Sequence, residues 1–141
     1  MSRYIHARCR KLNRSLAGHL HGGFVTCLAA RMNADGGRAV ATAGHPAPYP
    51  NGEEIPLSPS LPLGITVDAE YTETILRLAP GDTVTFFSDG VVEAQSPTGE
   101  LFGFERTRAI ASQSAQSIAD IAQRFGQEDD ITVLTLKFAP A

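Results

Sequence analysis

The chain has no tryptophan, only two cysteines and two methionines in 141 residues, and few charged side chains, 19% in all. Because the two cysteines lack a CxxC spacing, we expect Cys9 and Cys27 to be reduced thiols rather than part of a disulfide framework. No apolar run approaches the roughly 20 residues that span a bilayer. The arginines near the start are not followed by an apolar stretch, as they would be in a secretory signal. We therefore expect a cytoplasmic protein with no membrane partner.

What the chain does contain is typical of one globular domain, with 43% hydrophobic residues. Its net charge of −3 is unevenly distributed: residues 1–34 carry six basic residues and no acidic one, and the remainder carries six basic and fifteen acidic residues. A basic segment can bind nucleic acid, but among its clustered basic residues 3–14 Tyr4 is the only Phe, Tyr or Trp. We expect no nucleic-acid partner, and interpret the segment as a solvated helix face or as a surface covered by an acidic segment.

The hydrophobic pattern predicts an α+β fold. Residues 4–17 have helical periodicity, and two further helices are expected at 104–113 and 115–125. We expect one five-stranded, mainly antiparallel sheet with flanking helices, in which Asp35-Gly36 and Pro80-Gly81 each close a hairpin. The predicted strands lie near 24–33, 37–43, 72–79, 82–88 and 131–138. Residues 46–64 hold six of the nine prolines and are predicted to form an irregular loop.

Two aspartates at the ends of apolar strands are the strongest chemical signal. Asp89 closes the segment 82–89 and is followed by Gly90, and Asp129 opens the segment 129–136. Carboxylates at the ends of rigid strands are suited to bind a hard divalent cation through oxygen. Without further context, either residue could equally be an ordinary turn or strand-end aspartate.

Seven short motifs follow one another in a recognisable order. They are Phe24-Val25-Thr26, Ala43-Gly44-His45-Pro46, Leu61-Pro62-Leu63-Gly64, Pro80-Gly81-Asp82, Phe87-Ser88-Asp89-Gly90-Val91-Val92-Glu93-Ala94, Leu101-Phe102-Gly103 and Asp129-Asp130-Ile131-Thr132-Val133. Each motif alone is weak, but the series resembles the C-terminal part of a metal-dependent PPM-type serine/threonine phosphatase. It is most similar to the stage II sporulation protein E branch, whose bacterial members regulate sigma-factor partner switching.

The resemblance implies a fold, a cofactor and a reaction. The family folds as an α-β-β-α sandwich, of which this chain would form half or most. It holds two Mg²⁺ or Mn²⁺ ions whose bridging water attacks a phosphoserine or phosphothreonine, and such two-metal sites favour in-line displacement. The metal-ligand aspartates of the family match Asp89 and Asp129. We also expect supporting roles beside the ligands for Gly90, Asp130, Glu93 and His45. The substrate implied is a regulatory phosphoprotein such as an anti-sigma-factor antagonist.

The chain also departs from the family pattern. A Gly-Asp element and an Asp-x-x-Gly-His-Gly element, which hold further metal ligands in the family, do not occur. About half of the ligands for a two-metal centre are therefore missing, so we expect at most one weakly bound ion. Two functions stay open. The first is a phosphatase domain whose N-terminal metal-binding segment is missing from the sequence, or which is completed by a second copy or a complementing chain. The second is a catalytically incomplete module that binds a phosphoprotein or another partner.

The sequence does not favour a direct chemical role for four residues, His19, His21, Ser88 and His45. His19 and His21 have a metal-ligand spacing, but no cysteine or carboxylate lies near them, so they are expected to be loop histidines. Ser88 lacks the Gly-x-Ser-x-Gly surroundings of a nucleophile. For His45 we expect a hydrogen bond that fixes the start of the proline-rich loop.

Overall fold

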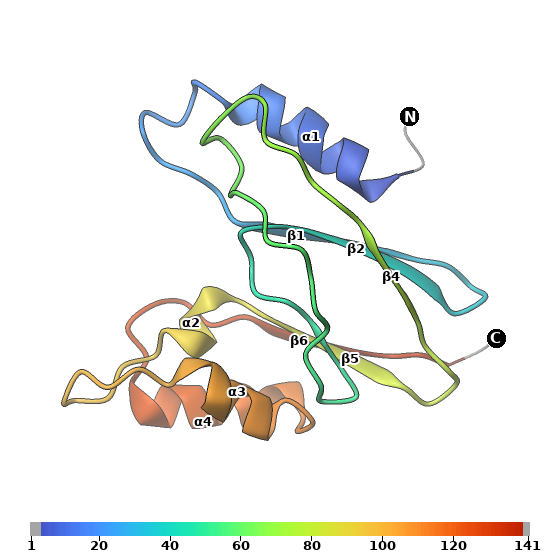
Figure 1. The fold of residues 1–141 in the computed structure, drawn as a ribbon. Helices are drawn as coiled ribbons and strands as arrows, with labels where there is room; N and C mark the ends of the chain where they lie inside the picture. Colours follow the sequence, from blue (N-terminus) through green and yellow to red (C-terminus); the bar gives the residue numbers. More distant parts are fainter. Residues whose placement is uncertain (1–3, 140–141) are drawn as a thin grey trace. The chain divides into compact units, whose positions relative to one another are not determined.

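The structure is a computed structural model that describes residues 4–139. It confirms the α+β fold class, with two three-stranded antiparallel sheets and helices packed on them (Figure 1). The described chain forms two compact units, which we treat separately. The first unit comprises residues 4–45 and 56–79, and the second comprises residues 46–55 and 80–139.

The first unit is a small sheet with one helix on it. Its strands are β1 (Cys27–Met32), β2 (Gly37–Ala43) and β4 (Thr74–Arg77), in the order β1-β2-β4. The predicted first hairpin is confirmed, because β1 and β2 pair from Cys27↔Ala43 to Met32↔Arg38. Gly36 supplies the positive φ of 86° that closes this hairpin.

The helix α1 (Ile5–Leu16) covers one face of this sheet (Figure 1). Ile5 and Cys9 pack on the alanines of β2, whose side chains alternate along the strand. The polar Asn13 lies in the same buried row of α1 and is fully buried. Its Nδ2 donates to the carbonyl oxygens of Thr66 (2.8 Å) and Val67 (3.4 Å), and its Oδ1 accepts from the Gly64 N–H (2.8 Å). One side chain thus fixes the loop 64–67 on the helix.

The second unit places three helices on the other sheet. Its strands are β3 (Tyr49–Pro50), β5 (Thr83–Phe87) and β6 (Val133–Lys137), in the order β3-β5-β6. The helices are α2 (Asp89–Val92), α3 (Gly103–Ile110) and α4 (Ala115–Gly126). Their apolar side chains share one core with the sheet, with Val91 and Ile118 fully buried. Tyr49 and Phe87 meet edge to face in this core, with ring centroids 5.1 Å apart.

The prediction of one five-stranded sheet is wrong. β4 and β5 do not form a hairpin around Pro80-Gly81, because β4 pairs with β2 and β5 pairs with β3 and β6. The Gly81 N–H donates to the carbonyl oxygen of Phe138 at 2.8 Å, so this turn joins the second sheet and ends the pairing with the first. A tight turn in the sequence therefore marks a change of sheet here.

Element boundaries are close to the prediction, with three exceptions. β1 begins at Cys27, and Phe24, expected inside it, is 60% exposed. The short strand β3 lies inside the predicted irregular loop, where Tyr49 pairs with Thr85. The helix α2 occupies residues for which no helix was predicted. β3 and α2 are too short for periodicity to reveal them.

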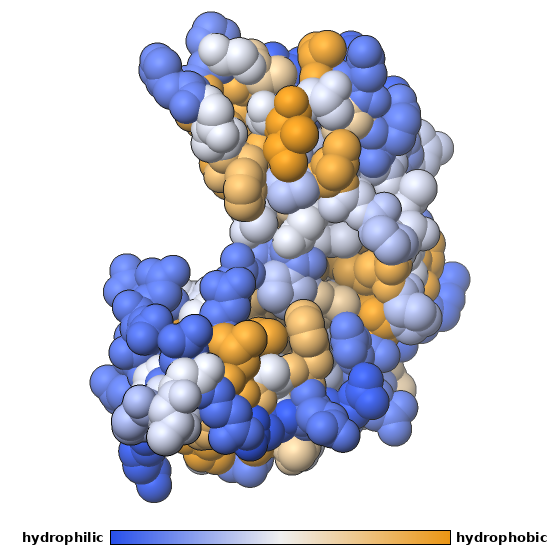
Figure 2. Space-filling model, turned by 60° about the vertical axis from the view of Figure 1, so that its left-hand side comes forward, coloured by the Kyte–Doolittle hydropathy of each residue, from blue (hydrophilic) through white to orange (hydrophobic). Residues whose placement is uncertain are grey.

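Large apolar side chains also reach the surface, seen as orange atoms on the face shown in Figure 2. Those that are at least half exposed are Tyr4, Phe24, Ile65, Val67, Ile75, Leu101, Phe104 and Leu134. Scattered apolar residues of this kind are common on soluble domains. Among residues 4–139, no helix has the length and apolar character that a bilayer span requires.

Asn13→Ala is expected to lower the free energy of unfolding by about 2–3 kcal/mol, because the peptide groups of the loop 64–67 lose their buried partners. Urea denaturation followed by circular dichroism measures the change. The control Ser15→Ala removes an exposed hydroxyl on the same helix and should change stability by less than about 0.5 kcal/mol. Equal stability of Asn13→Ala and wild type would show that Asn13 does not hold the loop.

Glu73 is expected to make the stability pH-dependent. Burial opposes its ionisation, but hydrogen bonds from His6 and from the Ile5 N–H outweigh burial and hold the pKa of its carboxyl below the usual range. A depressed folded-state pKa means that the stabilisation is present above the unfolded-state pKa and is lost as the pH falls through the folded-state pKa.

Glu73→Gln should therefore be less stable than wild type at neutral pH, and the difference should vanish in acid. The measurement is the free energy of unfolding of both proteins across the acid range. Glu70→Gln is the matched control, because Glu70 is 76% exposed and pairs with Arg10 only at 3.5 Å. A difference that does not change with pH would contradict the assigned role of the carboxylate.

Candidate functional site

The segments that carry the two aspartates lie side by side at one end of the second sheet. β5 and β6 pair in register up to Phe87↔Val133, and one step further the Ser88 N–H donates to the Thr132 carbonyl oxygen at 2.9 Å. Beyond this pair the segments approach so closely that a Cβ on Gly90 would overlap the carbonyl oxygen of Asp130. Glycine at position 90 is thus required by the approach itself.

Asp89 is the first residue of α2, directly after β5. A carboxylate in the first turn interacts favourably with the helix N-terminus. The side chain is half-buried, and its Oδ1 is shielded from solvent. Val91 and Gly90 are buried behind it, so the backbone that carries Asp89 is held by the core of the second unit.

Asp129 and Asp130 lie in the segment between α4 and β6, and both are exposed. Oδ1 of Asp129 accepts the Asp130 N–H at 2.8 Å, so the carboxylate is held by the neighbouring peptide group. The strand itself begins at Val133, two residues later than predicted.

A hollow of about 410 Å³ opens beside these segments in the second unit. Its lining includes three carboxylate residues and no basic residue, and consists of Gly90, Glu93, Gln95, Leu101, Glu128 and Asp129. Carboxylates gathered without a nearby cation repel one another, so the hollow favours a positively charged occupant. Glu93, which the sequence analysis placed beside the ligands, lies in this lining, whereas Asp89 and Asp130 do not.

The carboxylate side chains at this site are the right type of ligand for a hard divalent cation, but they are too few for a complete metal centre. Carboxylate oxygens are the donors that Mg²⁺ and Mn²⁺ prefer, and the close approach at Gly90 keeps the two segments together. Within residues 4–139, however, no three histidine, cysteine or acidic side chains are grouped so that they could hold a metal ion.

His45 belongs to the first unit, where it fixes the start of the proline-rich loop as expected. The Thr42 hydroxyl donates to the His45 carbonyl oxygen at 2.8 Å and accepts the His45 N–H at 3.0 Å. The imidazole Nδ1 lies 3.2 Å from the Thr26 hydroxyl. A supporting role of His45 at the metal site stays a prediction.

Three groups whose pKa values are raised, those of Cys9, Cys27 and Tyr49, are not suited to be nucleophiles. Cys9 and Cys27 are both free, as expected, and burial raises the pKa of each thiol. Burial, followed by the nearby Glu54 charge, raises the pKa of Tyr49 to about 12. All three groups are therefore protonated at neutral pH.

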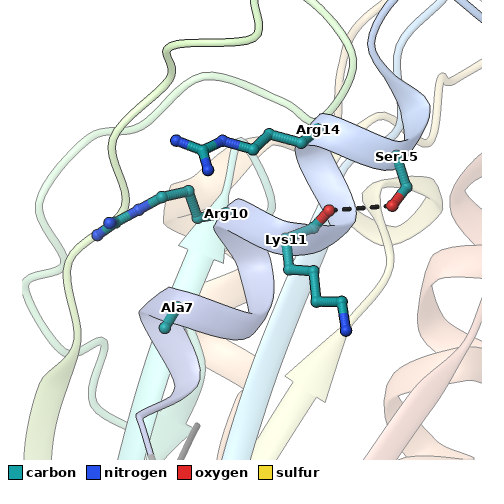
Figure 3. A pocket seen from close by; sticks show the side chains of 5 residues that line it. All are labelled: Ala7, Arg10, Lys11, Arg14 and Ser15. Atoms are coloured by element: carbon teal, nitrogen blue, oxygen red, sulfur yellow. Dashed lines mark hydrogen bonds between the residues drawn. The ribbon is translucent and has the colours of Figure 1, made fainter. Parts of the chain in front are cut away.

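A second hollow, of about 420 Å³, lies on the outer face of α1 (Figure 3). It is lined by Ala7, Arg10, Lys11, Arg14 and Ser15. Arg10 reaches the carboxylate of Glu70 at 3.5 Å, and Figure 3 shows Arg14 extending to the same side as Arg10. This face points away from the buried row of Ile5, Cys9 and Asn13, in agreement with a solvated helix face.

Sequence reasoning missed Gln95 and Leu101 at the rim of the acidic hollow. The two residues form an isolated antiparallel bridge, and the Gln95 N–H donates to the Gly126 carbonyl oxygen at 2.8 Å. Gly126 ends α4 with a φ of 142°, and a Cβ there would overlap the Gln95 backbone. The contact between Gly126 and Gln95 joins residues far apart in the sequence, so no local pattern indicates it.

A sequence model of the family described as stage II sporulation protein E matches residues 5–139 of the chain. The chain belongs to this family. The match confirms the resemblance that the order of motifs indicated, and covers nearly the whole chain rather than the aspartate motifs alone.

Solved structures share the fold of this stage II sporulation protein E family member. The RsbU and RsbW domains of a Mycobacterium tuberculosis protein align with a TM-score of 0.73 and 20% identity over 96% of this chain and 42% of that chain. The phosphatase domain of the cell fate determinant SpoIIE from Bacillus subtilis, presoaked with Mn, aligns with a TM-score of 0.56 and 22% identity over 81% of this chain and 56% of that chain.

Protein IcfG of Synechocystis is 27% identical over 85 residues, which are 52% of this chain and 13% of that protein. The chain thus spans only part of the length of each protein that it matches.

Gly90→Ala is expected to lower the free energy of unfolding by about 1–3 kcal/mol, because the new methyl group must displace the Asp130 backbone. It should also speed amide hydrogen exchange at Thr132, whose pairing with Ser88 would open. Denaturation and hydrogen exchange measure the two effects. Gly99→Asn is the control, since nothing lies within 4 Å of a Cβ there and asparagine tolerates its positive φ. Normal exchange at Thr132 in Gly90→Ala would contradict the close approach.

Proposed function

We propose that the chain is the C-terminal part of a metal-dependent protein phosphatase domain, acting on phosphoserine or phosphothreonine in a regulatory protein. Membership in the stage II sporulation protein E family supports the proposal. The observation that carries it is the acidic hollow beside Gly90, where the Asp89 and Asp129 segments meet. An anti-sigma-factor antagonist is the kind of substrate proposed, and a cytoplasmic location goes with it.

Asp89 and Asp129 are the residues proposed to hold Mn²⁺ or Mg²⁺. A divalent ion bound there would make a water molecule more acidic and neutralise charge on a phosphoryl group. The chain itself contributes two carboxylates: that of Asp89 at the start of α2, and that of Asp129, which accepts the Asp130 N–H. Glu93 and Glu128 add negative charge to the lining of the hollow and so raise its affinity for a cation. Gly90 and Asp130 form the contact that keeps the segments together.

The remaining ligands are proposed to come from a complementing chain, a second copy or a further segment. One observation favours a second function, a module that binds a phosphoprotein without hydrolysing it: no group of three metal-ligating side chains occurs among residues 4–139. The two functions differ in whether added ligands restore turnover.

The 141-residue chain alone is expected to bind Mn²⁺ weakly and to show little or no turnover, because two carboxylates do not fix a pair of ions. Binding is measured by titration with Mn²⁺, and turnover with p-nitrophenyl phosphate and a phosphoserine peptide. Asp89→Asn and Asp129→Asn should each abolish the weak binding, whereas Asp68→Asn, an exposed residue of the first unit, should leave it unchanged.

Three outcomes would change the proposal. Robust turnover that either substitution abolishes would show that the chain already obtains all of its ligands. Mn²⁺ binding that is insensitive to both substitutions would overturn the metal site. If turnover does not appear when a chain carrying the family's two missing aspartate elements is added, the binding module becomes the better function.

A further inference from the structure

At the end of the β5–β6 ladder, the hydroxyl group of Ser88 accepts the hydrogen bond that its backbone carbonyl group would ordinarily accept. Hydrogen-bonded pairs alternate along an antiparallel ladder. The Phe138 N–H donates to the Asp82 carbonyl oxygen at 2.8 Å, and the Ser88 N–H donates to the Thr132 carbonyl oxygen at 2.9 Å. Ser88 and Thr132 are thus a hydrogen-bonded pair, in which the Thr132 N–H would ordinarily donate to the Ser88 carbonyl oxygen. Instead it donates to the Ser88 hydroxyl oxygen at 2.8 Å.

Because the Thr132 N–H donates to the Ser88 hydroxyl group, the Ser88 carbonyl group can accept a hydrogen bond from α2. It accepts the Val91 N–H at 3.3 Å, which is the first turn of α2. The chain therefore passes from strand to helix at Asp89 without losing the last pair of the ladder. Figure 1 shows α2 beginning where β5 ends, with β6 alongside β5.

The Ser88 hydroxyl group is committed to the opposite segment and not to its own helix. Ser88 occupies the N-cap position of α2, where a serine hydroxyl usually accepts a helix N–H, but it makes no such bond. The Ser88 hydroxyl group donates instead to the Asp130 carbonyl oxygen at 3.4 Å. The hydroxyl thus spans two peptide groups just after Asp129, while Ser88 itself directly precedes Asp89.

We propose that Ser88 is a positioning residue that fixes the Asp129 segment beside Asp89 for cation binding. The inference rests on the proposed function. A hydroxyl is suited to this role because it accepts one hydrogen bond and donates another at the same time. Gly90 completes the arrangement by allowing the Asp130 backbone to lie against it.

Mn²⁺ affinity of the full chain, measured by titration and by electron paramagnetic resonance of unbound Mn²⁺, tests the proposal. Ser88→Ala should weaken Mn²⁺ binding about tenfold or more, as is typical when a residue that orients a metal ligand is lost. Ser88→Thr should restore it, and Ser88→Val should not, although the two differ in little except the hydroxyl. In Ser88→Ala and Ser88→Val the Thr132 amide should exchange faster with solvent.

Thr135→Val is the matched control. It removes the 3.0 Å hydrogen bond between the hydroxyls of Thr85 and Thr135 in the same ladder, away from the aspartates, and should leave Mn²⁺ affinity unchanged. Circular dichroism of each variant checks that it is folded, so that differences in Mn²⁺ affinity do not arise from unfolding.

The outcomes separate the two proposals. If Asp89→Asn abolishes Mn²⁺ binding but Ser88→Ala and Ser88→Val bind like wild type, the positioning role is wrong and the proposed function stands. If Thr135→Val weakens binding as much as Ser88→Ala, Ser88 acts only through strand stability and the inference is overturned. If Asp89→Asn leaves binding unchanged, the proposed metal site fails and the role of Ser88 fails with it.

Discussion

The pairing of β5 with β6 is the constraint on which the candidate site depends. Five residue pairs, from Thr83↔Lys137 to Phe87↔Val133, set the register, and that register decides which residues meet beyond the end of the ladder. A slip of one residue would turn every side chain of a strand to the other face of the sheet. It would also take Gly90 away from the Asp130 carbonyl and put a side chain where none fits. The register of β5 against β6 therefore also determines where the segments that carry Asp89 and Asp129 lie.

The first unit solves a different physical problem with a buried polar residue. The loop 64–67 has peptide groups that need partners, and Asn13 supplies them from within the apolar row of α1. A leucine at this position would pack in the core but could satisfy none of these groups. The helix and the loop are thereby specified together, which an apolar contact alone would not achieve.

Much of the fold could be predicted because its main strands and helices carry strong local patterns. The segment 83–87 and the helix 115–126 were placed within one or two residues. Pairing between strands could not be read in the same way: Pro80-Gly81 has the composition of a hairpin turn, yet its Gly81 N–H bonds to Phe138, far away in the sequence. The residues of a turn determine where the chain bends, but they do not determine which strand pairs with the one that follows the turn.

The candidate site was predictable only in part, for a related reason. Asp89 and Asp129 could be named because the order of motifs matched a family, and the acidic residue Glu93 lay close in sequence. The contribution of Ser88 could not be seen, since it depends on which pair of the ladder is hydrogen-bonded. Gln95 and Leu101 become part of the hollow only through tertiary contacts.

The helix α4 is held by contacts at both ends, so the number of residues in it determines where the chain leaves the helix. At its start the Ser114 hydroxyl accepts the Ser117 N–H at 3.1 Å, and at its end Gly126 lies against Gln95. An α-helix advances about 100° and 1.5 Å per residue. Inserting or deleting a single residue within α4 would rotate Gly126 away from Gln95 and redirect the chain that leads to Asp129. Evolution of this domain can exchange side chains on the outer face of α4 far more readily than it can change the number of residues in the helix.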